Sequence, residues 1–185
     1  VLEFLSYLRA TGRDFIFLTN NSSKDATYYA NKLAGLGIDC SVDNILTSGE
    51  ATALYLKNIK KSKKVYLVGT PILEEEFKRH GFLLTADQPD HVVLGFDTTL
   101  TYEKLEVSCD LIREKTPFIA THPDFNCPTE KGYIPDCGAM TALIKASTGV
   151  DPQVIGNPNK EIVDALLTKK NYTVDQMAMV GDRLY

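Results

Sequence analysis

The stretch that decides the fold is Phe15-Ile16-Phe17-Leu18-Thr19-Asn20-Asn21-Ser22-Ser23. Its apolar first half predicts a strand buried on both faces of a parallel sheet, and small polar residues then end that strand. A helical pattern at Val1–Ala10 precedes the strand, and a second one starts after Lys24, where Ser22 and Asp25 fit a capping box. This order of helix, buried strand, polar loop and helix predicts right-handed parallel crossovers.

The same alternation continues outward to the end of the chain. Further strands are predicted at residues 64–69, 91–96, 117–120, 154–155 and 177–180. Further helices are predicted at residues 71–80, 101–115, 140–146 and 159–169, and an irregular loop with three prolines at residues 121–137. A chain of this kind is typical of the α/β class with a doubly wound parallel sheet.

The composition indicates which classes of binding partner to exclude and which cellular compartment to expect. The 185 residues carry a net charge of −4, whereas a nucleic-acid surface needs lysine and arginine clustered over a whole face, so no nucleic acid is expected. No apolar run approaches the ~20 residues that span a bilayer, so no membrane is expected either. The four cysteines form no C-x-x-C pair, which predicts free thiols in a reducing, cytoplasmic compartment.

Two predicted strands end in residues suited to phosphate chemistry. Thr19, Asn20 and Asn21 offer a hydroxyl and two amides just before a helix N-terminus, which attracts anions. Asp182 follows the last strand, where a carboxylate suits Mg²⁺. Each feature also has a plain structural interpretation, because the Thr-Asn-Asn turn can be a connection with local capping and Asp182 can cap a loop.

A family resemblance rests on several segments in order. Residues 17–23, 156–160 and 180–185 resemble motifs II, III and IV of the haloacid dehalogenase superfamily, in its NagD-like, p-nitrophenylphosphatase-type branch. Residues 95–97, 101–105 and 118–124 resemble the cap that is inserted in that branch. The resemblance covers essentially the whole chain, and several ordered motifs are more specific than any single one.

The resemblance implies a fold and a reaction. It implies a Rossmann-like core at residues 1–46 and 151–185, interrupted by an inserted α/β cap at residues 47–150. It also implies a Mg²⁺-dependent phosphatase, in which an Asp nucleophile attacks a phosphomonoester and the aspartyl-phosphate is then hydrolysed. Thr19 and Asn20 would hold the phosphoryl group with Asn21 beside it, and Asp182 would bind Mg²⁺.

The resemblance also places candidates for substrate contacts. His122, Asp124 and Cys127 lie in a loop that resembles the family's substrate-specificity loop, and Phe96 matches a position that can face substrate. The alternatives are that His122 is merely an exposed loop residue and that Phe96 belongs to the core.

The sequence departs from the family at two functional positions. It contains no Asp-x-Asp pair, and residues 95–100 have the tail of that motif with glycine in place of the nucleophile, so we expect a fragment whose nucleophile precedes Val1. Asn157 stands where the branch usually has a lysine, which removes part of the electrostatic stabilisation. Lys160 is either an inward-reaching substitute or a solvated helix lysine.

We therefore expect a hydrolase of small sugar or nucleotide phosphates, with Mg²⁺ as cofactor and a small phosphorylated metabolite as partner. A homodimer through the cap is a further expectation. The competing interpretation is a pseudophosphatase that binds phosphate esters without turnover, which Asn157 favours. Another activity of the superfamily, such as that of a dehalogenase or a phosphomutase, agrees less well with the NagD-like cap.

Overall fold

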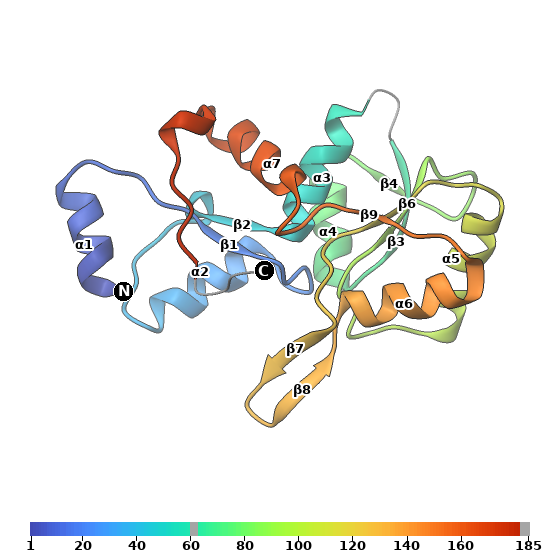
Figure 1. The fold of residues 1–185 in the computed structure, drawn as a ribbon. Helices are drawn as coiled ribbons and strands as arrows, with labels where there is room; N and C mark the ends of the chain where they lie inside the picture. Colours follow the sequence, from blue (N-terminus) through green and yellow to red (C-terminus); the bar gives the residue numbers. More distant parts are fainter. Residues whose placement is uncertain (60–62, 182–185) are drawn as a thin grey trace.

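A computed structural model describes residues 1–59 and 63–181 (Figure 1). The first part of the chain builds a two-stranded sheet flanked by helices, in the order α1 (Leu2–Ala10), β1 (Phe17–Thr19), α2 (Ala26–Ala34), the 3-10 helix η1 (Val42–Asn44) and β2 (Ile45–Thr47). β1 and β2 run parallel, with Phe17 opposite Ile45 and Thr19 opposite Thr47. The apolar stretch that precedes Thr19 therefore contains a strand, as predicted.

A five-stranded parallel sheet forms the larger part of the molecule. Its strands are β3 (Lys64–Val68), β4 (Leu83–Leu84), β5 (His91–Leu94), β6 (Phe118–Ala120) and β9 (Gln153–Val154). They lie in the order β4-β3-β5-β6-β9, so the chain winds from β3 to one edge and then crosses back to build the other. Such a reversal is where doubly wound sheets leave a crevice outside the carboxyl ends of their strands.

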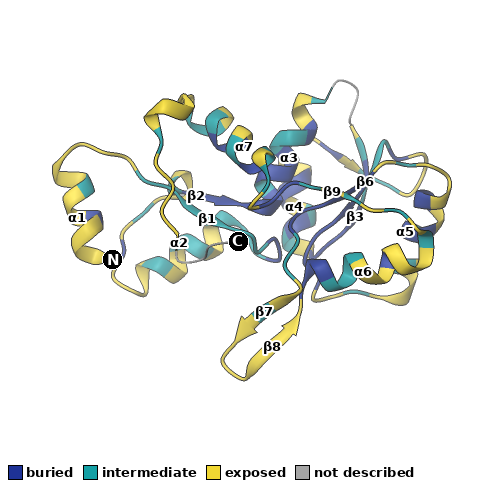
Figure 2. Ribbon diagram, viewed as in Figure 1, coloured by how far each residue is buried: buried dark blue, intermediate teal, exposed yellow. Residues whose placement is uncertain are grey.

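Helices cover both faces of this sheet, and its central strands β3, β5 and β6 are largely buried between them, whereas the edge strands β4 and β9 are partly exposed (Figure 2). The helices are α3 (Ser48–Asn58), α4 (Pro71–Arg79), α5 (Tyr102–Arg113), α6 (Cys137–Thr148) and α7 (Lys160–Lys170). On β5, Val93 packs in one cluster with residues of α3, α4 and α7, whereas Val92 and Leu94 pack in another with residues of α5 and α6. Because successive side chains of a strand point to opposite faces, one strand feeds both clusters. The predicted α/β class is confirmed.

Local signals set the helix starts. α4 begins at Pro71, and the side chain of its N-cap Thr70 accepts a hydrogen bond from Leu73 N. α5 begins after Thr101, whose side chain accepts from Lys104 N. Both starts agree with the sequence patterns. Within residues 1–59 and 63–181, we find no helix whose length and apolarity would allow it to cross a membrane.

The expectation of an irregular loop at residues 121–137 is wrong, because this segment contains an antiparallel hairpin. β7 (Asn126–Thr129) pairs with β8 (Gly132–Pro135), and Cys127 lies opposite Ile134. The hairpin projects from the body of the molecule (Figure 1). Pro128 and Pro135 hid it in the sequence, since proline cannot donate to a ladder; a two-stranded hairpin accepts proline because each strand keeps an open edge.

Two further local expectations are wrong. α2 begins at Ala26 with Asp25 as its N-cap, which accepts from Tyr28 N, so Ser22 takes no part in a capping box. Residues 177–180 form no strand, and Met179 and Val180 are exposed. An apolar run becomes a strand only where a second strand supplies backbone partners, and no described strand pairs with this run.

The last strand bears on the expected division of the chain. β9 pairs with β6, so the first strand of the segment expected to return to the core extends the sheet of the expected cap. The division into core residues 1–46 and 151–185 and a cap at 47–150 stays a prediction.

Phe77 tests the packing of the cluster beneath α4. Its side chain is fully buried, with its ring centroid 5.5 Å from that of Phe82. Phe77→Ala should lower the free energy of unfolding by about 3–5 kcal/mol, because the lost contacts leave a cavity. Tyr102→Ala, at an 83% exposed site, should change it by less than about 0.5 kcal/mol. Urea denaturation of both variants measures this, and equal losses would contradict the assignment of Phe77 to the core.

Candidate functional site

The loop after β1 docks onto the carboxyl ends of the large sheet. Ser22 is fully buried there, and its Oγ accepts a hydrogen bond from Phe96 N, two residues beyond β5, at 2.8 Å. The same Oγ lies 2.9 Å from Thr121 Oγ1, directly after β6. Thr70, which follows β3, donates from Oγ1 to Ser23 O at 3.0 Å. Residues beyond three strands of the sheet thus hold the loop that the sequence assigns to phosphate.

Asn20 ties the same loop to the end of β9. Its side-chain amide donates to Asn157 O and accepts from Asn157 N, both at 2.9 Å. The Asn20 side chain therefore satisfies both backbone groups of Asn157. Its Nδ2 also donates to Asp124 Oδ2 at 3.1 Å. Both amide hydrogens of Asn20 are therefore used within the protein, and this side chain positions the loop.

Gly156 allows the chain after β9 to pack closely against Thr121 and Asn20. Its backbone N donates to Thr121 O at 2.8 Å. A Cβ at this position would lie 2.5 Å from Thr121 O and 2.9 Å from Asn20 Oδ1, closer than a real Cβ approaches such atoms. The contact between β9 and the loop therefore requires glycine here.

A buried histidine extends the network into the segment before the hairpin. His122 Nε2 lies 2.8 Å from Asp136 Oδ1, and His122 Nδ1 lies 2.9 Å from Thr121 Oγ1. An aspartate carboxylate only accepts, so Nε2 carries a hydrogen and donates to Asp136. A continuous chain of hydrogen bonds thus runs from Phe96 N through Ser22, Thr121 and His122 to Asp136.

Ser48 gives the network a second attachment to the loop. This fully buried residue, the first of α3, donates from Oγ to Asn20 O. The same Oγ lies 3.3 Å from His122 Nδ1. The start of α3 therefore contacts both the loop after β1 and the histidine.

The hydroxyl of Thr19 lies at the end of β1. Its Oγ1 accepts from Asn21 N at 3.2 Å, and a side-chain hydrogen bond links this hydroxyl to the phenol of Tyr29. Burial raises the pKa of the neighbouring Tyr29 to about 12, and an interaction with Thr19 opposes this shift. Tyr29 is therefore a neutral phenol at neutral pH and leaves the site without an added negative charge.

The side chain of Asn21 faces the hairpin. Asn21 Oδ1 accepts from Ser23 N at 2.9 Å, and its Nδ2 points to Cys127 Sγ at 3.8 Å. Burial and nearby carboxylates raise the pKa of the Cys127 thiol, although the contact with Asn21 lowers it. Cys127 is therefore a neutral thiol that closes one side of the loop.

Most of the predicted site residues come together in this network. Direct contacts link Asn20 to Asp124 and Asn157, and link Asn21 to Thr19 and Cys127. Phe96 and His122 are 2% and 0% exposed. As placed, neither side chain presents surface to a substrate, and both instead support the loop.

Two predicted residues do not join the network. Lys160 lies at the start of α7 with an 84% exposed side chain, and its Nζ is 3.6 Å from Asp164 Oδ2. This agrees with the alternative of a solvated helix lysine, since an exposed ammonium gains more from water than from a buried loop. A catalytic role for Lys160 stays a prediction. Asp182 lies outside the described residues.

A groove of about 440 Å³ lies between β1 and the last described residues. Its walls include Phe17 and Leu18 of β1, Val163 and Leu166 of α7, and Met177. Gly181, which precedes Asp182, lines the same groove as Asn157. Within the described residues, β1 pairs with β2 on one edge and leaves its other edge without a strand.

One cluster among the described residues could hold a metal ion. His122, Asp124 and Asp136 each offer one ligand atom, all within 4.8 Å of one another. Mg²⁺ prefers a shell of oxygen ligands, whereas this cluster includes an imidazole that is already hydrogen-bonded to Asp136. The cluster therefore does not fit the expected Mg²⁺ site.

Sequence reasoning missed the residues that support the loop. Ser22 was expected to cap a helix, and no role was expected for Ser48, Thr121 and Asp136. Ser22 and Thr121 are 99 positions apart, so no local pattern links them. Only Asp136 carried a usable signal, since an acid just ahead of a helical pattern predicts an N-cap, and it does accept from Cys137 N.

Comparison with known proteins agrees with this architecture. A family model described as haloacid dehalogenase-like hydrolase matches residues 1–83. A protein of Bacillus subtilis named 5'-nucleotidase YutF is 34% identical over 180 residues, which cover 97% of this chain and 70% of that protein. A Staphylococcus aureus protein named acid sugar phosphatase is 35% identical over 181 residues, with the same coverage of 97% and 70%.

Solved structures give the same result. A 4-nitrophenylphosphatase from Thermotoga maritima superposes with a TM-score of 0.93 at 45% identity, covering 100% of this chain and 71% of that one. A structure described as a putative nagD protein superposes with a TM-score of 0.94 at 45% identity, covering 100% and 73%.

Ser22 offers a test of the docked loop. Ser22→Ala leaves Phe96 N and Thr121 Oγ1 buried without their shared partner, so it should lower the free energy of unfolding by about 1–3 kcal/mol. Ser6→Ala, on the exposed face of α1, serves as the matched control and should change it by less than about 0.5 kcal/mol. Chemical denaturation compares the two. A Ser22→Ala protein as stable as the control would show that the loop does not depend on this hydroxyl.

Gly156 offers a second, steric test. Gly156→Ala forces a Cβ against Thr121 O and should lower the free energy of unfolding by about 1–3 kcal/mol. Gly35→Ala is the control, because Gly35 has a helical φ of −62° and its Cβ would come no closer than 3.4 Å to Lys32 O. That control should be neutral or slightly stabilising. Thermal melts of the two variants decide the point, and a harmless Gly156→Ala would contradict the close approach.

Proposed function

Because this chain belongs to the NagD-like branch of the haloacid dehalogenase-like hydrolases, we propose that it forms the phosphate loop and cap of a Mg²⁺-dependent phosphatase acting on small sugar or nucleotide phosphates. The observation that carries the proposal is the loop after β1, which is held at the carboxyl ends of the large sheet and begins with the hydroxyl of Thr19. The relatives named acid sugar phosphatase and 5'-nucleotidase support this choice of substrates.

Thr19 and Asn20 take different parts in the proposed reaction. Thr19 donates its hydroxyl hydrogen to an oxygen of the transferring phosphoryl group, where a preorganised donor stabilises developing negative charge. Asn20 keeps the loop in register with Asn157 and Asp124, since its amide hydrogens are already used. Asn20 is thus proposed as a positioning residue.

We place the proposed Mg²⁺ near the end of the groove beside β1. Asp182 would supply a carboxylate ligand, and the adjacent Gly181 lines the groove together with Asn157, which supports this placement. When bound, Mg²⁺ would neutralise charge on the phosphoryl oxygens.

The nucleophile is proposed to occupy the same groove. This sequence contains no Asp-x-Asp motif, and the aspartyl-phosphate route of the family requires one. A strand that carries this motif would find backbone partners on the open edge of β1 and an apolar bed between β1 and α7. We therefore propose that the nucleophile strand precedes the present chain and lies beside Thr19.

Substrate choice is assigned to the segment that carries the hairpin. Asp124, Cys127 and Asn157 surround the loop after β1 and are the proposed substrate contacts. The backbone N of Phe96 binds Ser22 of that loop, and the ring of His122 is hydrogen-bonded to Thr121 and Asp136. The proposed partner is a small phosphorylated metabolite rather than nucleic acid or membrane, and a homodimer through the cap stays part of the proposal. Four free cysteines support a reducing, cytoplasmic compartment.

A pseudophosphatase is the second candidate function. Asn157 brings no positive charge, and the exposed Lys160 is paired with Asp164. Both observations lower the electrostatic stabilisation available to a transferring phosphoryl group.

Phosphate release from a panel of sugar and nucleotide monophosphates tests the proposal. Protein from the full-length gene should release phosphate with Mg²⁺ and not with EDTA, and Asp182→Asn should be inactive. Thr19→Val removes one donor and should lower kcat/KM by about 10²–10³-fold. Thr168→Val, at an exposed position on α7, should leave it unchanged. No turnover in a folded protein that still binds phosphate esters would replace the phosphatase by the pseudophosphatase.

A further inference from the structure

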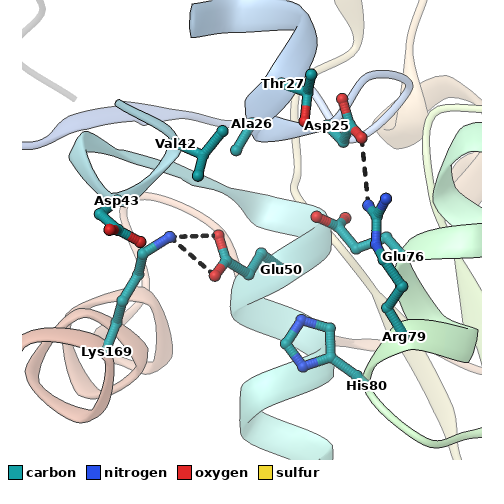
Figure 3. A pocket seen from close by; sticks show the side chains of 10 residues that line it. All are labelled: Asp25, Ala26, Thr27, Val42, Asp43, Glu50, Glu76, Arg79, His80 and Lys169. Carbon is teal, nitrogen blue, oxygen red and sulfur yellow. Dashed lines mark hydrogen bonds and ion pairs between the residues drawn. The ribbon is translucent and has the colours of Figure 1, made fainter. Parts of the chain in front are cut away.

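A second pocket lies between the helices, apart from the loop after β1. It has a volume of about 220 Å³ and is formed by the start of α2, η1, the first turn of α3, the end of α4 and the end of α7 (Figure 3). A cavity of about 150 Å³ can hold benzene, so this pocket has room for a small organic molecule. The proposed phosphatase reaction uses none of its side chains.

Glu76 is the unusual residue of this pocket. It is 4% exposed, and its Oε2 is buried without a hydrogen-bond partner. Figure 3 shows its carboxylate pointing into the space between Glu50 and Asp25. Gly49 of α3 makes room for it, because a Cβ at Gly49 would lie 2.8 Å from this oxygen. A buried carboxylate oxygen with no donor is costly, so a ligand that supplied one would be strongly favoured.

The other charges of the pocket leave the space beside Glu76 acidic. Arg79 Nη2 lies 3.2 Å from Asp25 Oδ2, and Lys169 Nζ lies 2.8 Å from Glu50 Oε2, so both cations are occupied by neighbouring carboxylates. Neither of these ion pairs includes Glu76. A positively charged ligand is therefore the complement of this space.

We propose that this pocket binds a small organic cation whose ammonium or guanidinium group donates hydrogen bonds to the carboxylate of Glu76.

A metal ion fits the pocket less well. A metal site needs several His, Cys, Asp or Glu ligand atoms close to one point. Among the described residues, only His122, Asp124 and Asp136 form such a group of three or more, and they lie outside this pocket. No three carboxylates of the pocket thus converge on one point as ligands of a metal ion. An amine or guanidinium needs only one carboxylate for its charged end and can fill the remaining volume with its own atoms.

Protonation of Glu76 competes with the ligand. Burial, and then the charge of Glu50, raises the pKa of Glu76 to about 8. A cation favours the ionised carboxylate, so binding below this pKa must release a proton, and affinity should fall by up to about ten-fold for each unit of lower pH. Burial and nearby cations lower the pKa of His80, which keeps this ring neutral over the same range. The titratable or charged groups that face Glu76 from the packed elements are Asp25, Asp43, Glu50, Arg79, His80 and Lys169.

Isothermal titration calorimetry with 1,4-diaminobutane and with methylguanidinium tests the proposal. At about pH 9 at least one of these probes should bind saturably to the wild-type protein, and NaCl at equal ionic strength should give no saturable heat. At about pH 6.5 the dissociation constant should be about ten-fold or more higher. Glu76→Gln, which keeps the shape and removes the charge, should abolish binding.

Glu75→Gln is the matched control. Glu75 is the adjacent residue on α4, 63% exposed and paired with Lys78, so this variant should bind like the wild type. Absence of saturable binding of both probes at about pH 9, or equal affinity in Glu76→Gln, would overturn the proposal. If Glu76→Gln does not fold, the pH series of the wild type decides, because affinity that does not change with pH would equally overturn it.

Discussion

The arrangement of this protein depends on the burial of one short polar loop against the ends of another sheet. Asn20 and Ser22 follow β1 in the chain. Their side chains accept hydrogen bonds from the backbone N of Asn157, beyond β9, and of Phe96, beyond β5. A buried polar group without a partner costs on the order of 1–3 kcal/mol, so these matched groups disfavour other positions of the loop. The small β1–β2 sheet and the large five-stranded sheet are thereby held in a defined relation.

Close packing explains the sequence of residues 95–100, which resembles the tail of the nucleophile motif. A Cβ at Gly95 would lie 2.5 Å from Leu73 Cδ2 and 3.1 Å from Ser22 Oγ, so a side chain here would have to displace Leu73 and would crowd Ser22. Asp97, whose side chain is fully buried, pairs with Lys104 Nζ at 2.7 Å and accepts from Thr99 N. This acid supports the turn after β5, next to Phe96, which binds Ser22. The segment thus serves the docking of the loop.

α3 connects the two polar regions of the molecule. Ser48 at its first position contacts Asn20 and His122, whereas Glu50 faces the second pocket and pairs with Lys169 of α7. Hydroxyl and amide groups of Thr19, Asn20 and Ser22 make up the loop after β1, with the carboxylate of Asp124 beside them, whereas four carboxylates, Glu76 among them, line the second pocket. Hydrogen-bond donors suit a phosphate, while carboxylates suit a cation, so the two proposed ligands do not compete.

Periodicity, capping residues and short motifs close together in the chain predicted the α/β class, the helix starts at Pro71 and Tyr102, the buried strands β3, β5 and β6, and the family. The sequence by itself also indicated Thr19, Asn20 and Asn157, which the structure brings together. Only the tertiary structure revealed the roles of Ser22, His122 and Asp136, the hairpin among the prolines, and the unpartnered oxygen of Glu76. It also decided that residues 177–180 have no strand beside them. These features depend on contacts between residues that are far apart in the chain, and local sequence patterns do not predict such contacts.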